Sequence, residues 1–282
     1  PRSTLCSVTM LFRSLRGSDS VEMASRDGRR VQMIRAAWLF LFGLAHYLLL
    51  WWGDILMVYA VVGLAALPFA GRQPIALVKW AFLAFLLHFL IVGSTVAGMI
   101  MWHSAAAAPG ATPAIAQGYG DFMSGMSDPQ SPAILAEVER YRDSFAAIVG
   151  HHISQYPSEW LRNLVFTGFD TLGFMLLGMA MLKSGFLTGR WGADQYRRPA
   201  RHCFTVGAPP LLPLGLYIMA SDYPPLATMG SVLAWSFPFR IPMVVAWAAL
   251  ILGRAGRDAA HPVLARIGAA GRLALTDYLG ST

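Results

Sequence analysis

The chain has 282 residues, of which 56% are hydrophobic and only 13% are charged, and its mean hydropathy is +0.50. Soluble globular domains carry about 25% charged residues, so this composition excludes an ordinary soluble protein and indicates several membrane spans. The formal net charge of +7 comes from basic residues that lie between the apolar runs and form no continuous stripe. This distribution favours topogenic charge over a nucleic-acid partner.

The two ends of the sequence predict partial helices. The apolar run at residues 5–12 is too short to cross a bilayer, and the last stretch, GRLALTDYLGST (271–282), opens an apolar helix and stops. We therefore expect residues 1–282 to form a single truncated transmembrane domain from a larger membrane protein. The two cysteines, Cys6 and Cys203, are too few for a disulfide framework or a cysteine metal site.

Residues 33–70 predict a transmembrane hairpin. The first span covers about residues 33–52 and the second about residues 54–70, with Trp51-Trp52-Gly53-Asp54 between them. Segment 13–35, before the hairpin, is rich in arginine and is expected to be cytoplasmic, which places the hairpin tip at the outer surface. At this tip, Asp54 is accounted for by solvation or by capping of the second span.

Four further spans follow, each an apolar run bounded by polar or basic residues. They cover about residues 79–102, 160–183, 203–220 and 226–253. Most of the Lys and Arg residues fall in loops that this topology assigns to the cytoplasm, which supports the orientation. The sequence therefore predicts an all-α polytopic transmembrane helix bundle with about six complete spans and partial helices at both ends.

One long polar segment, residues 103–158, separates the third and fourth spans and is expected on the outer side. It contains one predicted amphipathic helix, residues 132–149, whose apolar residues recur at helical spacing. Ser131 suits the N-cap of this helix and Gly150 suits its C-terminal cap. The helix is expected to lie on the membrane surface or to pack against the bundle.

Two charged residues are predicted near the middle of the bilayer, Asp170 in the fourth span and Arg240 in the sixth. Arg240 lies between Pro238 and Pro242, which disfavour regular helix, and a broken helix at this depth is tolerated only in protein or along a cavity. We therefore hypothesise that Asp170 and Arg240 face the same interior space, as a pair or across a ligand. The alternative is a structural ion pair that holds two helices together.

Two histidines also lie inside predicted spans. His46 is near the outer end of the first span, and His88 is in the inner half of the third. A histidine in a span is more often a neutral packing residue than a catalyst, so a packing role and a functional role are both open for each. His103, His151 and His152 are expected on the outer side, and their spacing predicts no metal site.

Three blocks of the sequence carry a family resemblance. They read GLAHYLLLWWGDILMVYAVVGL (43–64), LGFMLLGMAMLKSGFLTG (172–189) and GRLALTDYL (271–279). In order and spacing, they resemble the YeiB-like bacterial inner-membrane proteins, known as domain of unknown function 418 (DUF418). The resemblance implies a multi-pass inner-membrane protein without an established reaction. It also implies a distant similarity to membrane acyltransferases, which pass an acyl group from a cytoplasmic donor to an acceptor across the bilayer.

Three functions are compatible with these features. The first is transfer of acyl groups from acyl-CoA to a cell-envelope acceptor, with His46 and Asp170 as catalytic candidates and Arg240 and His88 as substrate-binding candidates. The second is a small-solute transporter in which the proline-flanked Arg240 forms the solute site. The third is a membrane scaffold whose outer segment recruits a partner. The sequence contains no Gly-rich phosphate loop, G-x-S-x-G, C-x-x-C or HEXXH motif, so we expect no metal and no resident cofactor.

Overall fold

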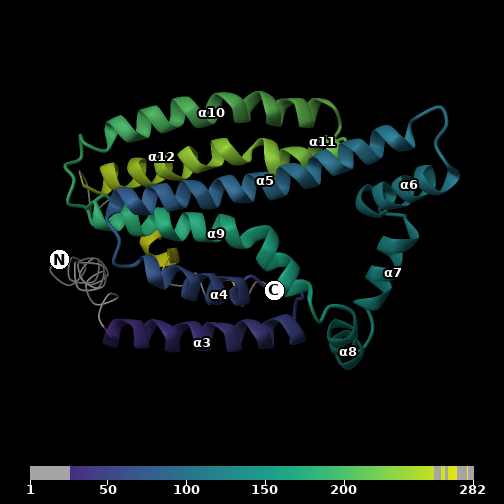
Figure 1. Cartoon of the computed structure of the whole chain (residues 1–282), viewed down its shortest axis with the longest axis horizontal. Coiled ribbons are helices and arrows are strands. Elements are labelled where there is room, and N and C mark those ends of the chain that lie inside the picture. The colour runs from purple at the N-terminus through teal and green to yellow at the C-terminus, as the bar shows by residue number, and fades with distance from the viewer. Residues whose placement is uncertain (1–25, 257–261, 264–265, 272–277, 279–282) are drawn as a thin grey trace. The chain divides into compact units, whose positions relative to one another are not determined.

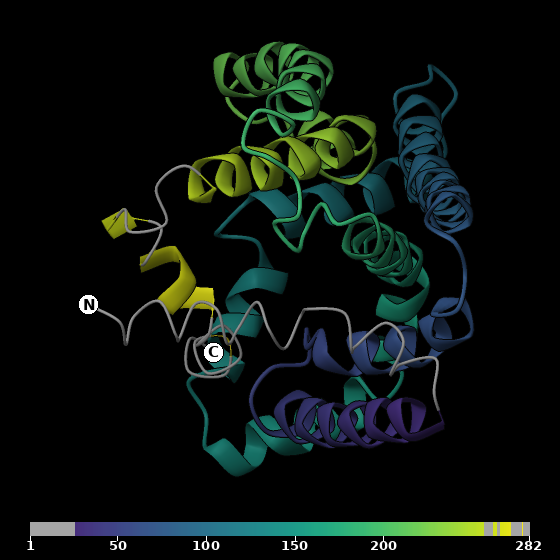
Figure 2. The same ribbon diagram turned by 90° about the vertical axis from the view of Figure 1, so that its left-hand side faces the viewer.

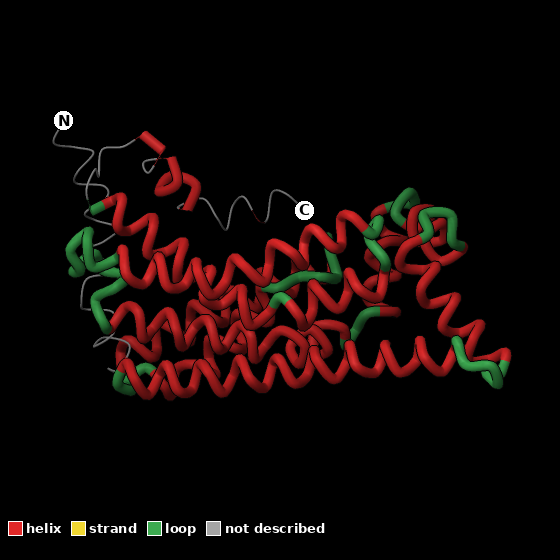
Figure 3. Tube along the Cα trace, turned by 90° about the horizontal axis from the view of Figure 1, so that it is seen from above, coloured by secondary structure: helices red, strands yellow, loops and turns green. Residues whose placement is uncertain are grey.

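The computed structural model describes residues 26–256, 262–263, 266–271 and 278, and within these residues the secondary structure is entirely helical (Figures 1 and 3). The helices in chain order are α3 (Arg26–Leu49), α4 (Leu56–Ala66), the 3-10 helix η1 (Leu67–Phe69), α5 (Pro74–Ala106), α6 (Pro113–Ser127), α7 (Pro132–Arg140), α8 (Phe145–Gln155), α9 (Glu159–Lys183), α10 (Arg197–Ala220), α11 (Pro225–Gly230), the π-helix η2 (Ser231–Trp235) and α12 (Phe237–Ala255). The predicted partial helix at 5–12 lies outside the described residues, as does the closing helix apart from Gly271 and Tyr278.

The predicted all-α membrane fold is confirmed. Five helices of the described chain are long and apolar enough to cross a membrane: Gly28–Leu49, Pro74–Ala106, Glu159–Lys183, Arg197–Ala220 and Phe237–Ala255. The second predicted span is a shorter apolar helix, Leu56–Phe69. At 1.5 Å per residue its 11 α-helical and 3 3-10 residues extend only about 21 Å, less than the ~30 Å hydrocarbon core. The second of the six predicted spans, which was expected to be complete, is therefore a short helix in this structure.

The described residues group into two compact units. The first, here called the hairpin unit, comprises the described parts of Pro1–His88, Tyr156–Phe204 and Val244–Thr282. The second unit comprises Phe89–Gln155 and Thr205–Met243.

In the hairpin unit, α3 and α4 lie side by side as an antiparallel pair, and α4 packs in turn against α9 (Figures 1 and 2). Two aromatic residues of the hairpin reach the segment that precedes α9. The Tyr47 hydroxyl donates to the main-chain carbonyl of Tyr156, and the Trp52 ring stacks on the Tyr156 ring with 4.9 Å between centroids. These contacts join the hairpin tip to the start of α9, about a hundred residues later in the chain.

The loop between α9 and α10 is tightly folded against the end of α12. Phe186 and Tyr196 form a buried cluster with Ala249, and the Tyr196 hydroxyl donates to the Phe186 carbonyl at 2.5 Å. Gly185 has φ +83°, a left-handed conformation that favours glycine and lets the chain turn directly after α9. The Lys183 amine donates to the Ala70 and Arg72 carbonyls, and this contact joins the end of α9 to the chain that follows η1.

The second unit differs from the sequence prediction in its polar segment. Three helices, α6, α7 and α8, fill this segment, and the single helix expected over residues 132–149 is divided at residues 141–144. The N-terminal part of that prediction is confirmed, because the Ser131 hydroxyl accepts from the Ile134 N–H at 3.4 Å. The helix ends early at Tyr141, and the Ser144 hydroxyl accepts from the Ala147 N–H at the start of α8.

The irregular helix predicted around Arg240 occurs earlier in the chain. The irregularity is the π-helix η2 and the following Ser236, whose hydroxyl donates to the Ser231 carbonyl at 2.6 Å. Pro238 lies in the first turn of α12, where a missing N–H costs little, and Pro242 is accommodated inside the helix. Arg240 is thus part of a regular α-helix that begins just after the break.

Candidate functional site

A buried histidine–aspartate pair closes the tip of the hairpin. His46 lies in the last turn of α3, and Asp54 lies in the connection to α4. The His46 Nδ1 atom is 2.9 Å from the Asp54 Oδ2 atom. His46 is only 3% exposed and Asp54 is 0% exposed, so the pair is removed from solvent by the protein itself. Burying a carboxylate costs free energy unless it is paired and hydrogen-bonded. The other partners of Asp54 therefore show how its burial is compensated.

The second carboxylate oxygen of Asp54 binds the start of α4. Asp54 Oδ1 accepts from the Leu56 N–H at 2.8 Å and from the Met57 N–H at 3.2 Å. These are main-chain donors that a helix cannot satisfy internally, and the positive end of the helix dipole favours the negative charge. The predicted capping role of Asp54 is therefore confirmed, whereas the alternative explanation by solvation is wrong because the side chain is fully buried.

Tyr278 completes the site from the far end of the chain. Its hydroxyl donates to Asp54 Oδ2 at 3.2 Å and accepts from the Ile55 N–H at 3.4 Å. The Tyr278 ring also lies against the His46 ring, with 5.5 Å between centroids. Asp54 thus contacts α3, the start of α4 and a residue 224 positions away in the sequence.

Gly43 makes the close approach of α3 to this turn feasible. A Cβ atom at residue 43 would lie 2.8 Å from the Met57 main-chain N and 3.0 Å from Asp54 Oδ1. Gly43, His46 and Tyr47 are spaced three and four residues apart, so they share one face of α3. All three are buried, which identifies this face as the side of α3 that packs on the hairpin tip.

The arrangement is chemically suited to proton transfer. A carboxylate that accepts the Nδ1–H of a histidine leaves Nε2 as the basic nitrogen of the ring, and the 2.9 Å between His46 Nδ1 and Asp54 Oδ2 is within reach of such a bond. The same carboxylate stabilises the imidazolium that forms when Nε2 takes a proton. Because Asp54 is held by two main-chain N–H groups and a tyrosine hydroxyl, the histidine has a fixed partner.

The structure brings one of the four predicted site residues, His46, into this constellation. His88 lies on α5 and is buried, at 6% exposure, and Asp170 is half-buried on α9; both belong to the hairpin unit. Sequence reasoning missed Asp54 and Tyr278 as members of the site. The available signals were that Asp54 follows His46 by eight residues around a tight turn, and that Tyr278 lies in a block already recognised for its family resemblance.

Arg240 belongs to the second unit and is exposed. Its Nη2 atom donates to the Val232 carbonyl in the π-helix at 3.1 Å, and its guanidinium carbon lies 5.5 Å from the centre of the Phe237 ring. Through this hydrogen bond, the Arg240 guanidinium serves as a donor for a main-chain carbonyl at the helix break, where the regular pattern of main-chain hydrogen bonds is interrupted. The hypothesis that Arg240 and Asp170 face one interior space stays a prediction.

Metal ligation has no support in the part of the chain that the structure describes. Within it, no group of three or more His, Cys, Asp or Glu side chains is arranged to hold a metal ion. His152 is fully buried, and its Nε2 atom lies 3.1 Å from the Tyr141 hydroxyl.

Fold and site together define a multi-pass helical membrane protein with a histidine–aspartate pair buried in a helical hairpin. Comparison with known proteins identifies its relatives. Residues 181–282 match the family described as "Protein of unknown function (DUF418)". The chain is also 28% identical over 281 residues to the uncharacterized protein YeiB of Escherichia coli (strain K12), an alignment that covers 96% of this chain and 66% of the relative. The two matches confirm the predicted YeiB-like, DUF418 relationship. No solved structure matches the chain.

Proposed function

We propose that the protein is an acyltransferase of the bacterial inner membrane that modifies a cell-envelope acceptor. The observation that carries this proposal is the buried His46–Asp54 pair, because acyl transfer to a hydroxyl requires a positioned general base. The family resemblance to membrane acyltransferases supports the same reaction class. The alignment covers about two thirds of the length of YeiB. The proposed activity is therefore that of the full-length protein, of which this chain is compared over its own length.

In the proposed reaction, His46 Nε2 removes the proton of an acceptor hydroxyl as its oxygen attacks the carbonyl carbon of an acyl thioester. The carbon–sulfur bond then breaks, the acyl group remains on the acceptor oxygen, and the thiolate leaves with the proton that His46 had taken. Acyl-CoA is the proposed donor. Asp54 acts as the positioning residue, because it fixes the tautomer of His46 and stabilises the imidazolium.

The predicted orientation gives this chemistry a direction. With the arginine-rich start of α3 on the cytoplasmic side, the end of α3 that carries His46 faces the outer half of the bilayer. An envelope acceptor would therefore approach the pair from the periplasm, and the acyl group would arrive from the cytoplasmic donor.

The test is acyl transfer by the intact protein in lipid nanodiscs. Labelled acetyl-CoA and palmitoyl-CoA are supplied together with an extract of envelope lipids and glycans, and the release of CoA thiol and labelled product is followed. We expect His46→Ala to lower kcat/KM by about 10²–10⁴-fold, the usual contribution of a general base, and added imidazole to restore part of the loss. His202→Gln, an exposed histidine on α10, is the matched control and should retain activity.

Rescue by imidazole distinguishes a catalytic His46 from one that only packs. Added imidazole can replace a missing general base, but it cannot restore a missing packing contact. A His46→Ala protein that melts at the wild-type temperature and transfers acyl groups at the wild-type rate would refute the proposal. Loss of activity in His46→Ala without any rescue, accompanied by a lowered melting temperature, would assign the pair to stability alone.

A second candidate function is transport of a small anionic solute, and the helix break supports it. Transporter sites are often built where a membrane helix is interrupted, and the π-helix η2 lies between α11 and the start of α12, which carries Arg240. Uptake of solute into proteoliposomes that is lost in Arg240→Gln but retained in His46→Ala would favour the transporter. Acyl transfer that is lost in His46→Ala but retained in Arg240→Gln, without solute uptake, would favour the acyltransferase.

A further inference from the structure

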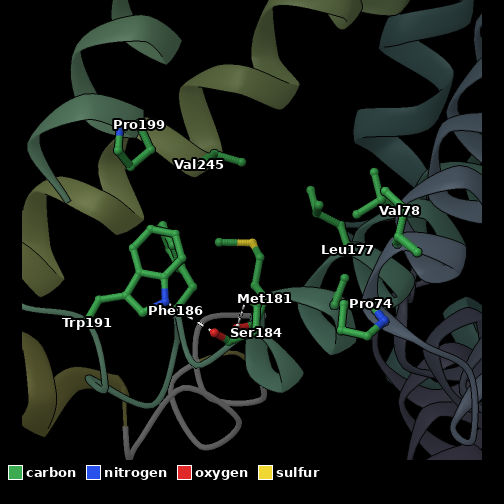
Figure 4. A pocket seen from close by; sticks show the side chains of 11 residues that line it. Pro74, Val78, Leu177, Met181, Ser184, Phe186, Trp191, Pro199 and Val245 are labelled. Atoms are coloured by element: carbon green, nitrogen blue, oxygen red, sulfur yellow. Dashed lines mark hydrogen bonds between the residues drawn. The ribbon is translucent and has the colours of Figure 1, made fainter. Parts of the chain in front are cut away.

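An apolar pocket of about 460 Å³ lies in the hairpin unit at the ends of three candidate spans (Figure 4). Its walls come from the start of α5, the end of α9, the loop after α9, the start of α10 and one residue of α12. The labelled side chains around the opening come from three elements: Val78 from α5, Leu177 and Met181 from α9, and Trp191 from the loop after α9 (Figure 4). This volume falls in the range of known small-molecule sites, about 300–1,000 Å³.

The polar groups of the lining are already used by the protein. The Ser184 hydroxyl donates to the Met181 carbonyl at 3.0 Å, and the Trp191 indole N–H donates to the Ser184 carbonyl at 3.2 Å. The other lining side chains are aliphatic, aromatic, proline or methionine. A polar ligand would therefore lose its hydration without replacing its hydrogen bonds, whereas a hydrocarbon chain would lose nothing.

The pocket lies at the ends of candidate membrane spans. Pro74 is the first residue of α5, and Ser184 directly follows the last residue of α9. Pro199 is in the first turn of α10. Three candidate spans thus begin or end at its lining, which corresponds to the edge of the hydrocarbon core. Trp191 in the wall fits this level, because tryptophan is enriched at membrane interfaces.

Basic residues adjoin the lining in the sequence. Arg190 precedes Trp191 and Arg198 precedes Pro199, and both arginines are exposed. The nearby Asp194 is in an ion pair with Arg197, 3.4 Å apart. Arg190 and Arg198 are thus two exposed cations, each next in sequence to a lining residue. Basic pockets between membrane helices on the cytoplasmic side are suited to anionic headgroups.

We propose that this pocket binds one acyl chain of an anionic phospholipid, with the headgroup phosphate held by Arg190 and Arg198. The wall is preformed, because the Tyr196–Phe186 bond and the contacts of Lys183 with the Ala70 and Arg72 carbonyls hold the loop in place without a ligand. Little ordering free energy is then lost on binding. The inference does not depend on acyl transfer, since lipid retention is measured without catalysis.

The experiment measures lipids that remain bound to the purified protein. The protein is incubated with equal amounts of phosphatidylglycerol and phosphatidylcholine of identical acyl chains, and bound lipid is counted by native mass spectrometry. We expect one phosphatidylglycerol to be retained in preference to phosphatidylcholine. Val78→Trp, which fills the pocket from a half-exposed position, should lower this retention at least about tenfold.

Charge removal tests the headgroup contact separately. The double variant Arg190→Gln/Arg198→Gln should bring the two lipids to near-equal retention without abolishing binding. Leu212→Trp, on an exposed part of α10, and Arg142→Gln, in the second unit, are the matched controls and should bind as the wild type does. The melting temperature of each variant shows that it is folded.

Three results would overturn the proposal. Equal lipid retention in Val78→Trp and Leu212→Trp would show that the bound lipid is annular and does not occupy the pocket. An unchanged preference for phosphatidylglycerol in the double arginine variant would remove the headgroup assignment. In a parallel incubation with palmitoyl-CoA, retention of palmitoyl-CoA together with exclusion of phosphatidylglycerol would show that the pocket binds a soluble acyl thioester and no phospholipid.

Discussion

Gly43 and Asp54 lie so close that no side chain fits between them: a Cβ atom on residue 43 would be 3.0 Å from Asp54 Oδ1 and closer still to the Met57 main-chain nitrogen. The close packing of α3 on the turn that holds Asp54 therefore depends on a glycine. The contact is with the start of a helix and with a buried carboxylate, neither of which can move as a flexible side-chain end does.

This contact predicts the effect of Gly43→Ala. Alanine normally favours a helix over glycine by up to about 1 kcal/mol, but here the added methyl group forces the hairpin apart. We expect a net destabilisation of about 1–3 kcal/mol, the usual cost of overpacking, seen as a lower melting temperature in detergent. Gly63→Ala, in α4 of the same hairpin, is the control, because its Cβ would meet nothing within 4 Å. The Gly63→Ala protein should be as stable as the wild type or more so.

Removing the hydroxyl of Tyr278 tests the link between the end of the chain and the hairpin tip. In Tyr278→Phe, Asp54 Oδ2 loses one donor and the Ile55 N–H loses its acceptor. We expect a loss of about 1–3 kcal/mol in stability, because the buried Asp54 carboxylate is left with fewer partners. Tyr217→Phe, an exposed tyrosine on α10, should change the melting temperature little. Equal melting temperatures for Tyr278→Phe and the wild type would contradict the contact.

Tyr196 provides a prediction of pH dependence outside the spans. Burial raises the pKa of the Tyr196 phenol above its ordinary value, so the folded state favours the neutral form. The contribution of this group to stability is therefore complete below about pH 10 and declines as the pH rises above it. We expect the wild-type melting temperature to fall above that pH. Tyr196→Phe should melt lower at neutral pH but show a shallower alkaline decline, which a titration of melting temperature against pH will measure.

The sequence predicted the helical class, the hairpin and its tip, because apolar run length and the Trp51-Trp52-Gly53-Asp54 block are local signals. It did not reveal which residues meet inside the protein. In a bilayer both faces of a helix are apolar, so the periodicity that identifies the buried face of a soluble helix is largely lost. Asp54 was therefore interpreted from its position at the tip alone, without its cross-turn partner His46 and its distant partner Tyr278.

Two further differences between prediction and structure have physical causes, one local and one long-range. The helix break was expected at the prolines around Arg240, but Pro238 lies in the first turn of α12, where proline is tolerated. The break lies instead at the π-helix over Ser231–Trp235, for which the sequence offers no comparable signal. The pairing of His46 with Tyr278 spans more than two hundred residues, and contacts of that range cannot be inferred from the spacing within a single sequence.

A double-mutant cycle on His46 and Asp54 gives the most direct test of the pair. Asp54→Asn removes the negative charge that His46 contacts at 2.9 Å, and His46→Gln removes the ring from the same contact. Leaving a buried donor or acceptor without its partner typically costs about 1–3 kcal/mol, and more where the remaining group is charged. We expect each single variant to be strongly destabilised. The double variant should lose much less stability than the sum of the two single losses, with a coupling of about 1–3 kcal/mol.

Asp54→Asn is preferred to alanine for this cycle, because Asp54 also accepts from the Leu56 and Met57 N–H groups. The amide oxygen of asparagine can still accept those bonds. The unfolding free energies are measured in the same detergent for all four proteins. Simple additivity of the two single changes would show that His46 and Asp54 contribute independently, and would remove the physical basis for an aspartate-positioned base.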